Sequence, residues 1–170
     1  PDAADRLRRV LAAARQVKSS IAQVGRDMTD APAAGSQPLR DKRLLVVESD
    51  ERLRRAAHLM LGRLGATVET AATGADGLAL AADAPYDAIF QEVKPPDMGG
   101  YECYRRLRAA CPGATVALTT GFGYDVAHSI VKARADGMRH VLFKPFRPDQ
   151  VVRAVLDGDG PPPDGIRPLL

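Results

Sequence analysis

Short apolar runs alternate with longer amphipathic segments from Arg43 to about residue 157. The pattern predicts strands near 43–48, 66–71, 87–92, 114–119 and 139–143, and helices near 50–64, 74–83, 99–111, 124–136 and 147–157. Strand–helix units joined by short turns with glycine or proline are typical of a parallel α/β sheet with helices on both faces. Right-handed crossovers then require the strand order to reverse, which opens a crevice at the carboxyl ends of the first and third strands.

The first 28 residues follow a different spacing. Residues 3–28 have a helical pattern in which apolar side chains alternate between spacings of three and four residues. These are Leu7, Val10, Ala14, Val17, Ile21, Val24 and Met28. This heptad seam predicts an N-terminal helix over 1–28 that pairs with a second copy of the chain in a coiled coil. The alternative is a helix that docks its apolar stripe on another domain of the same protein.

Two segments predict linking or disordered regions around one globular domain over 43–157. Residues 29–42 are rich in Ala, Pro, Gly and Ser and predict a flexible linker. The Pro- and Gly-rich tail at 158–170 predicts disorder. The chain begins at Pro1 and not at Met, so we expect a fragment or a processed product of a longer protein.

Charge and cysteine content narrow the classes of function. Residues 1–43 contain nine Lys and Arg against five Asp and Glu, whereas residues 44–157 contain 14 of each. This balance of charge in the globular part argues against a nucleic-acid partner. Cys103 and Cys111 lie eight residues apart on one predicted helix, about 12 Å by helical rise, which is too far for a disulfide. We expect both to be packing residues of a reduced, cytoplasmic protein. No apolar run is long enough to predict a helix that spans a membrane.

Polar side chains follow four of the predicted strands. LLVVESDE ends the first strand, DAIFQEVKPPDMGGYE contains the third, LTTGFGYD ends the fourth and VLFKPF ends the fifth. Carboxyl ends of parallel strands meet at one edge of the sheet. We therefore expect a set of side chains to converge there, namely Glu48, Asp50 or Ser49, Glu92, Thr120 and Lys144.

In this order and spacing, the four motifs resemble the receiver domain of two-component signalling. The resemblance implies a flavodoxin-like sheet of strand order 2-1-3-4-5 and a cis peptide bond between Lys144 and Pro145. It also implies a chemistry in which a carboxylate attacks a phosphohistidine, with Mg²⁺, a lysine and a hydroxyl binding the phosphoryl oxygens. The corresponding positions are Glu92 for the phosphoacceptor, Glu48 and Ser49 for the acidic pair, Thr120 for the hydroxyl and Lys144 for the lysine.

Several positions depart from the family's pattern. Glu92 is longer than aspartate by one methylene, about 1.5 Å, which moves the nucleophile from its expected place. Ser49 removes a charged ligand. Asp50 is the candidate to compensate for it, although it stands one residue later than the family's second acid. We therefore expect at most a weak Mg²⁺ site at Glu48 and Glu92 and no other cofactor. The longer Glu92 is predicted to reach Lys144 and imitate the phosphoryl charge. Val141 replaces the aromatic residue that commonly moves with the hydroxyl.

These departures predict a degenerate receiver, or pseudo-receiver, that acts as a regulatory or protein-interaction module in phosphorelay signal transduction. We expect it to be the C-terminal part of a hybrid sensor kinase or a similar protein. The chain itself is predicted not to be an enzyme, although the full-length protein can include a histidine kinase. Its expected partners are a kinase or another signalling domain, bound through the helices near 124–136 and 147–157, and a second copy bound through residues 1–28. The alternatives are a working, phosphate-accepting receiver and a coiled-coil scaffold with the receiver fold as a spacer.

Overall fold

The computed structural model describes residues 35–121 and 127–158. Its strands are β1 (Arg43–Val47), β2 (Thr67–Ala71), β3 (Ala88–Glu92), β4 (Thr115–Thr120) and β5 (Val141–Phe143). Its helices are α2 (Glu51–Arg63), α3 (Gly74–Asp83), α4 (Gly100–Ala110), α5 (Ala127–Ala135) and α6 (Pro148–Asp157). Each of these elements was predicted from the sequence. The predicted N-terminal helix and the tail beyond Gly158 lie outside the described residues.

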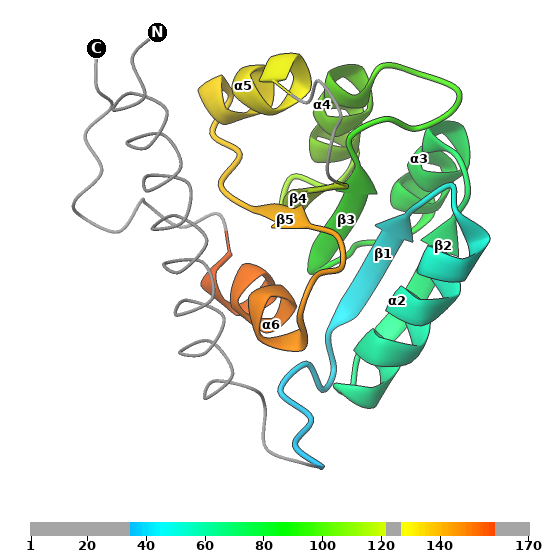
Figure 1. The fold of residues 1–170 in the computed structure, drawn as a ribbon, viewed down its shortest axis with the longest axis vertical. Helices are drawn as coiled ribbons and strands as arrows, with labels where there is room; N and C mark the ends of the chain where they lie inside the picture. The colour runs from blue at the N-terminus through cyan, green and yellow to red at the C-terminus, as the bar shows by residue number, and fades with distance from the viewer. Residues whose placement is uncertain (1–34, 122–126, 159–170) are drawn as a thin grey trace, which may run out of the picture. The chain divides into compact units, whose positions relative to one another are not determined.

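The strands form one parallel sheet in the order β2-β1-β3-β4-β5, which confirms the predicted topology. Helices cover both faces of this sheet (Figure 1). One core lies between the sheet and α2 with α6, and the other lies between the sheet and α3, α4 and α5. The carboxyl ends of β1 and β3 are neighbours, as the reversal of strand order requires.

Burial explains the apolar runs of the central strands. Successive side chains of β1 point to opposite faces, so Leu44 and Val46 pack in one core and Leu45 and Val47 in the other. All five residues of β3 are buried. Strands covered on both faces read as continuous apolar runs. The edge strand β2 is partly exposed and carries Thr and Glu instead.

The globular unit begins earlier than the sequence predicted. Leu39 is fully buried and belongs to the core between the sheet, α2 and α6. Its backbone N–H donates to the carbonyl of Leu64 at 2.9 Å. Gly65 has a φ of 97°, and a Cβ there would lie 2.9 Å from the Cβ of Gln37, so this glycine admits the turn before β1. The predicted linker over 29–42 is therefore wrong for its last residues.

Both cysteines are packing residues, as predicted. Cys103 and Cys111 are free and buried. Burial raises the pKa of the Cys103 thiol to about 12, which keeps it in the unreactive protonated form. Separately, no helix among the described residues is long and apolar enough to cross a membrane.

Candidate functional site

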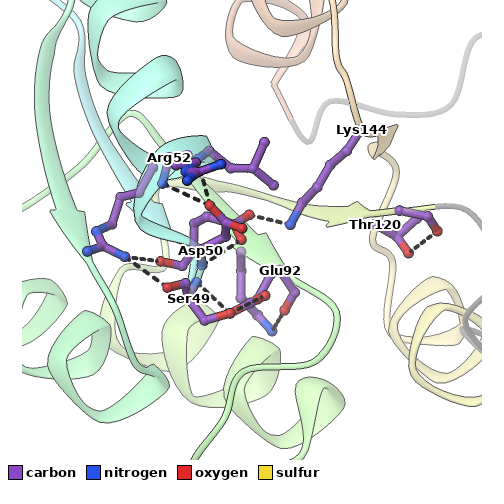
Figure 2. Close-up of polar contacts among 11 residues, drawn as sticks. Ser49, Asp50, Arg52, Glu92, Thr120 and Lys144 are labelled. Carbon is purple, nitrogen blue, oxygen red and sulfur yellow. Dashed lines mark hydrogen bonds and ion pairs between the residues drawn. The ribbon is translucent and has the colours of Figure 1, made fainter.

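A cavity of about 570 Å³ opens at the carboxyl edge of the sheet. All the side chains predicted to converge line it, and both of the alternatives Ser49 and Asp50 are among them: Glu48, Ser49, Asp50, Glu92, Thr120 and Lys144. The loop between β3 and α4, residues of β4, Leu53 of α2 and Ser129 of α5 form further parts of its wall. The expected convergence is thus confirmed, and Figure 2 shows how these groups are paired.

Ser49 holds the carboxylate of Glu92. Glu92 is the last residue of β3 and is only 8% exposed. The backbone N–H of Ser49 donates to Oε1 at 2.8 Å, and the Ser49 hydroxyl donates to Oε2 at 3.0 Å. Burial raises the pKa of the Glu92 carboxyl above its ordinary value and the charge of Glu48 adds to this, while the bonds from Ser49 act in the opposite direction. Glu92 is directed toward the turn after β1.

Lys144 forms its ion pair with Glu48 and not with Glu92. Its side chain extends from the end of β5 toward β1 (Figure 2). The Glu48 side chain is only 6% exposed and also accepts a hydrogen bond from the backbone N–H of Asp50. The expected direct pair between Glu92 and Lys144 is therefore wrong. Its physical reason is that the extra methylene of glutamate carries the Glu92 carboxylate to the amide and hydroxyl of Ser49.

Asp50 is the N-cap of α2. Its carboxylate accepts hydrogen bonds from the backbone N–H groups of Arg52 at 2.8 Å and Leu53 at 3.1 Å (Figure 2). The bond from Leu53, followed by the bond from Arg52, lowers the pKa of Asp50. The carboxylate is thus engaged at the start of the helix, which argues against the idea that Asp50 compensates for Ser49.

Two threonines line the cavity, whereas the sequence predicts a role for Thr120 alone. The Thr120 hydroxyl donates to the carbonyl of Gly121 at 3.2 Å, and in Figure 2 Thr120 stands apart from Glu92. Thr119 lies opposite Glu92 in the register of β3 and β4 and lines the same cavity. Paired residues of adjacent parallel strands face the same side of a sheet, so Thr119 is the second candidate hydroxyl. The two consecutive threonines in the sequence indicate that a hydroxyl lies near this edge of the sheet. Only the strand register shows that Thr119 is the one paired with Glu92.

Comparison with known proteins agrees with this geometry. The model of the response regulator receiver domain family matches residues 44–156. The chain belongs to this family. The receiver chain from Methanospirillum hungatei JF-1, described as CheY-like, superposes with a TM-score of 0.62 at 26% identity, over 68% of this chain and 91% of that one.

Two curated relatives extend the comparison to longer proteins. Transcriptional regulatory protein AfsQ1 of Streptomyces coelicolor is 34% identical over 66% of this chain and 50% of its own length. Probable histidine kinase 2 of Oryza sativa subsp. indica is 30% identical over 80% of this chain and 14% of its own length. This chain therefore spans half or less of the length of these relatives. Receiver domains of this kind occur in both kinases and regulators.

The receiver's acidic side chains do not form an arrangement that fits Mg²⁺. This ion requires near-octahedral oxygen ligands. Both oxygens of Glu92 accept from Ser49, and the Glu48 carboxylate is shared between Lys144 and the backbone of Asp50. Across residues 35–121 and 127–158, no three or more Asp, Glu, His or Cys side chains are grouped to hold a metal ion.

Two further positions of the receiver are as the sequence placed them. The peptide bond between Lys144 and Pro145 is cis, as predicted. Val141 is the first residue of β5, lies beside Leu118 of β4, and packs half-buried against the core under α3, α4 and α5. An aliphatic side chain in this position has no ring to exchange between solvent and core.

Proposed function

We propose that this receiver domain is degenerate and acts in phosphorelay signalling as a regulatory protein-interaction module that does not accept phosphate. One observation carries the proposal: Ser49 binds both carboxylate oxygens of Glu92, while Lys144 is paired with Glu48. The acceptor position and the lysine position thus have partners within the protein, in an arrangement that needs neither phosphate nor metal.

The pairing disfavours phosphoryl transfer for two physical reasons. A nucleophilic carboxylate needs an oxygen lone pair directed at the incoming phosphorus, and a misplacement of 1 Å can cost on the order of 10²-fold in rate. Glu92 instead directs its oxygens at Ser49. Charge on the transferred group also needs Mg²⁺ and a lysine, yet Lys144 already neutralises Glu48. We infer that Mg²⁺ binds weakly at most.

The larger protein is part of the same proposal. Because related receiver domains occur within longer histidine kinases and regulators, we propose that this chain is the C-terminal part of a hybrid sensor kinase or a similar signalling protein. We propose that α5 and α6 form its docking surface for a kinase or another signalling domain. A cytoplasmic location stays a prediction from the sequence.

Phosphotransfer to the native chain tests the proposed function. Incubation with a small acyl-phosphate donor, with and without Mg²⁺, is expected to leave the chain unlabelled by intact-mass spectrometry, because Ser49 occupies the Glu92 carboxylate. A working receiver treated in parallel is the positive control. Labelling that depends on Mg²⁺ would replace this proposal with the alternative of a phosphate-accepting receiver.

Self-association through the predicted N-terminal helix is a separate expectation. If the heptad seam pairs two chains, removing residues 1–30 should convert a dimer to a monomer in light scattering. Replacing Leu7 and Ile21 by lysine in the full chain should have the same effect without shortening it. Replacing the non-seam residues Ala12 and Ala13 by lysine is the matched control and should leave the mass of a dimer. Equal masses for the full and shortened chains would favour a helix that docks on another domain.

A further inference from the structure

The loop between β3 and α4, residues 93–99, forms one wall of the carboxyl-edge cavity. This loop is fastened to the start of α3 by Asp97. Oδ1 of Asp97 accepts from the backbone N–H of Gly74 at 2.8 Å, and Oδ2 accepts from that of Ala75 at 2.8 Å. These two residues open α3, where N–H groups lack helical partners and a negative charge is favoured. A single side chain thus joins the loop to a helix 22 residues or more away in sequence.

Close packing supports this attachment. A Cβ on Gly74 would lie 2.9 Å from the sulfur of Met98, so the Met98 side chain packs directly against the first residue of α3. Met98 in turn lines the cavity. The residue that follows Asp97 therefore forms part of the cavity wall, at the point where Asp97 fixes the backbone.

The other end of the loop is tied beside Glu92. Gln91 is fully buried, and its side-chain Nε2 donates to the carbonyls of Glu92 at 3.0 Å and Gly100 at 2.9 Å. A Cβ on Gly100 would come within 1.8 Å of the carbonyl oxygen of Val93. Because its two ends are held together at β3, the remaining freedom of the loop lies in its middle, where Asp97 stands.

We propose that Asp97 is a positioning residue, which holds the loop wall against α3 and thereby sets the surroundings of Glu92. The role concerns the shape of the cavity, whatever the cavity binds, and so goes beyond the proposed function. The bonds from the backbone N–H groups of Ala75 and Gly74 also lower the pKa of Asp97, which keeps its carboxylate ionised.

Nuclear magnetic resonance of the full chain tests this role with Asp97→Ala. Loss of two hydrogen bonds to a charged group should accelerate hydrogen exchange of the Gly74 and Ala75 amides about tenfold or more. The methyl signal of Met98 and the titration midpoint of the Glu92 carboxyl should both move. A change at Glu92 distinguishes positioning from a merely stabilising cap on α3.

The matched control is Thr73→Ala, which removes the local cap of the same helix. Thr73 Oγ1 accepts from the backbone N–H of Asp76 at 3.1 Å and makes no bond to the loop in the structure. This variant should accelerate exchange at Asp76 and leave the Met98 methyl and the Glu92 titration unchanged. Equal effects of the two variants on Glu92, or no effect of Asp97→Ala on it, would overturn the proposal.

A milder variant covers the case in which Asp97→Ala does not fold. Asp97→Asn keeps the volume of the side chain but leaves one oxygen to accept from the two amides. It should shift the same signals in the same direction by a smaller amount, and unchanged signals would count against the proposal. Phosphate labelling of the native chain would refute the proposed function and leave these expectations as they are.

Discussion

Replacing Lys144 by methionine is expected to lower the free energy of unfolding by about 3–5 kcal/mol, because a buried carboxylate then loses its partner. That carboxylate is Glu48, whose side chain is only 6% exposed. Methionine keeps most of the length of the lysine side chain, so the loss reports the charge more than the packing. Urea unfolding at pH 7 measures the difference.

Two further variants isolate the pair. Glu48→Gln combined with Lys144→Met should recover most of the lost stability, since both charges are then gone. Glu92→Gln should change the free energy of unfolding by less than about 1 kcal/mol, because Ser49 still offers hydrogen bonds to the amide. If Glu92→Gln were as damaging as Lys144→Met, the main ion pair would lie at Glu92 after all.

The direction of the Glu92 pKa shift gives a second reason to expect little loss of stability from Glu92→Gln. Burial raises the pKa of Glu92, so its contribution to stability is present at low pH and is lost as pH rises through the folded-state value. At neutral pH the ionised carboxylate therefore disfavours the folded chain. Glu92→Gln removes this contribution, which is why no large loss is expected from it.

The second large effect is a gain of function in the double variant Glu92→Asp with Ser49→Asp. An aspartate side chain at position 92 is too short to reach the turn after β1, where the Glu92 carboxylate binds. The carboxylate introduced by Ser49→Asp would supply a charged oxygen ligand for Mg²⁺. We expect Mg²⁺-dependent labelling by an acyl-phosphate donor to exceed the background measured for the native chain on the order of 10²-fold. Intact-mass spectrometry of parallel reactions measures the ratio.

Each single variant is a control for the double one. Glu92→Asp alone restores the length of the acceptor but leaves the metal ligand missing, so its labelling should be intermediate. Ser49→Asp alone replaces the hydroxyl that donates to Glu92 by a second carboxylate, while the backbone N–H at position 49 remains a donor. Like charges at this distance should lower the melting temperature. A double variant that labels no better than the native chain would show that these two positions do not limit phosphate acceptance.

Much of the fold could be predicted from the sequence because burial on two faces makes β1, β3 and β4 into distinct apolar runs. Turn residues and caps such as Asp50 then mark where helices begin. The burial of Leu39 cannot be predicted in this way. It is a single large apolar residue among Ala, Gly, Ser and Pro, and its burial depends on the core between the sheet, α2 and α6, which only the folded chain creates.

The site was predictable as a set of residues but not as a set of pairs. Topology brings the ends of β1, β3, β4 and β5 together, and this alone gathers Glu48, Glu92 and Lys144. Which carboxylate meets the lysine depends on one methylene and on the exposed amide of Ser49. The sequence does not distinguish Thr119 from Thr120, because the strand register that separates them cannot be read from two adjacent threonines.

The burial of Leu39 changes where this module should be cut and joined. The family match begins at residue 44, yet the side chain that closes the core beside Leu64 lies five positions earlier. A chimaera spliced at residue 44 would lose Arg43, the first residue of β1, and would also lack the Leu39 side chain in its core. Recombination that keeps the segment from Gly35 onward would transfer a complete unit, so the portable part of this protein is longer than its family signature.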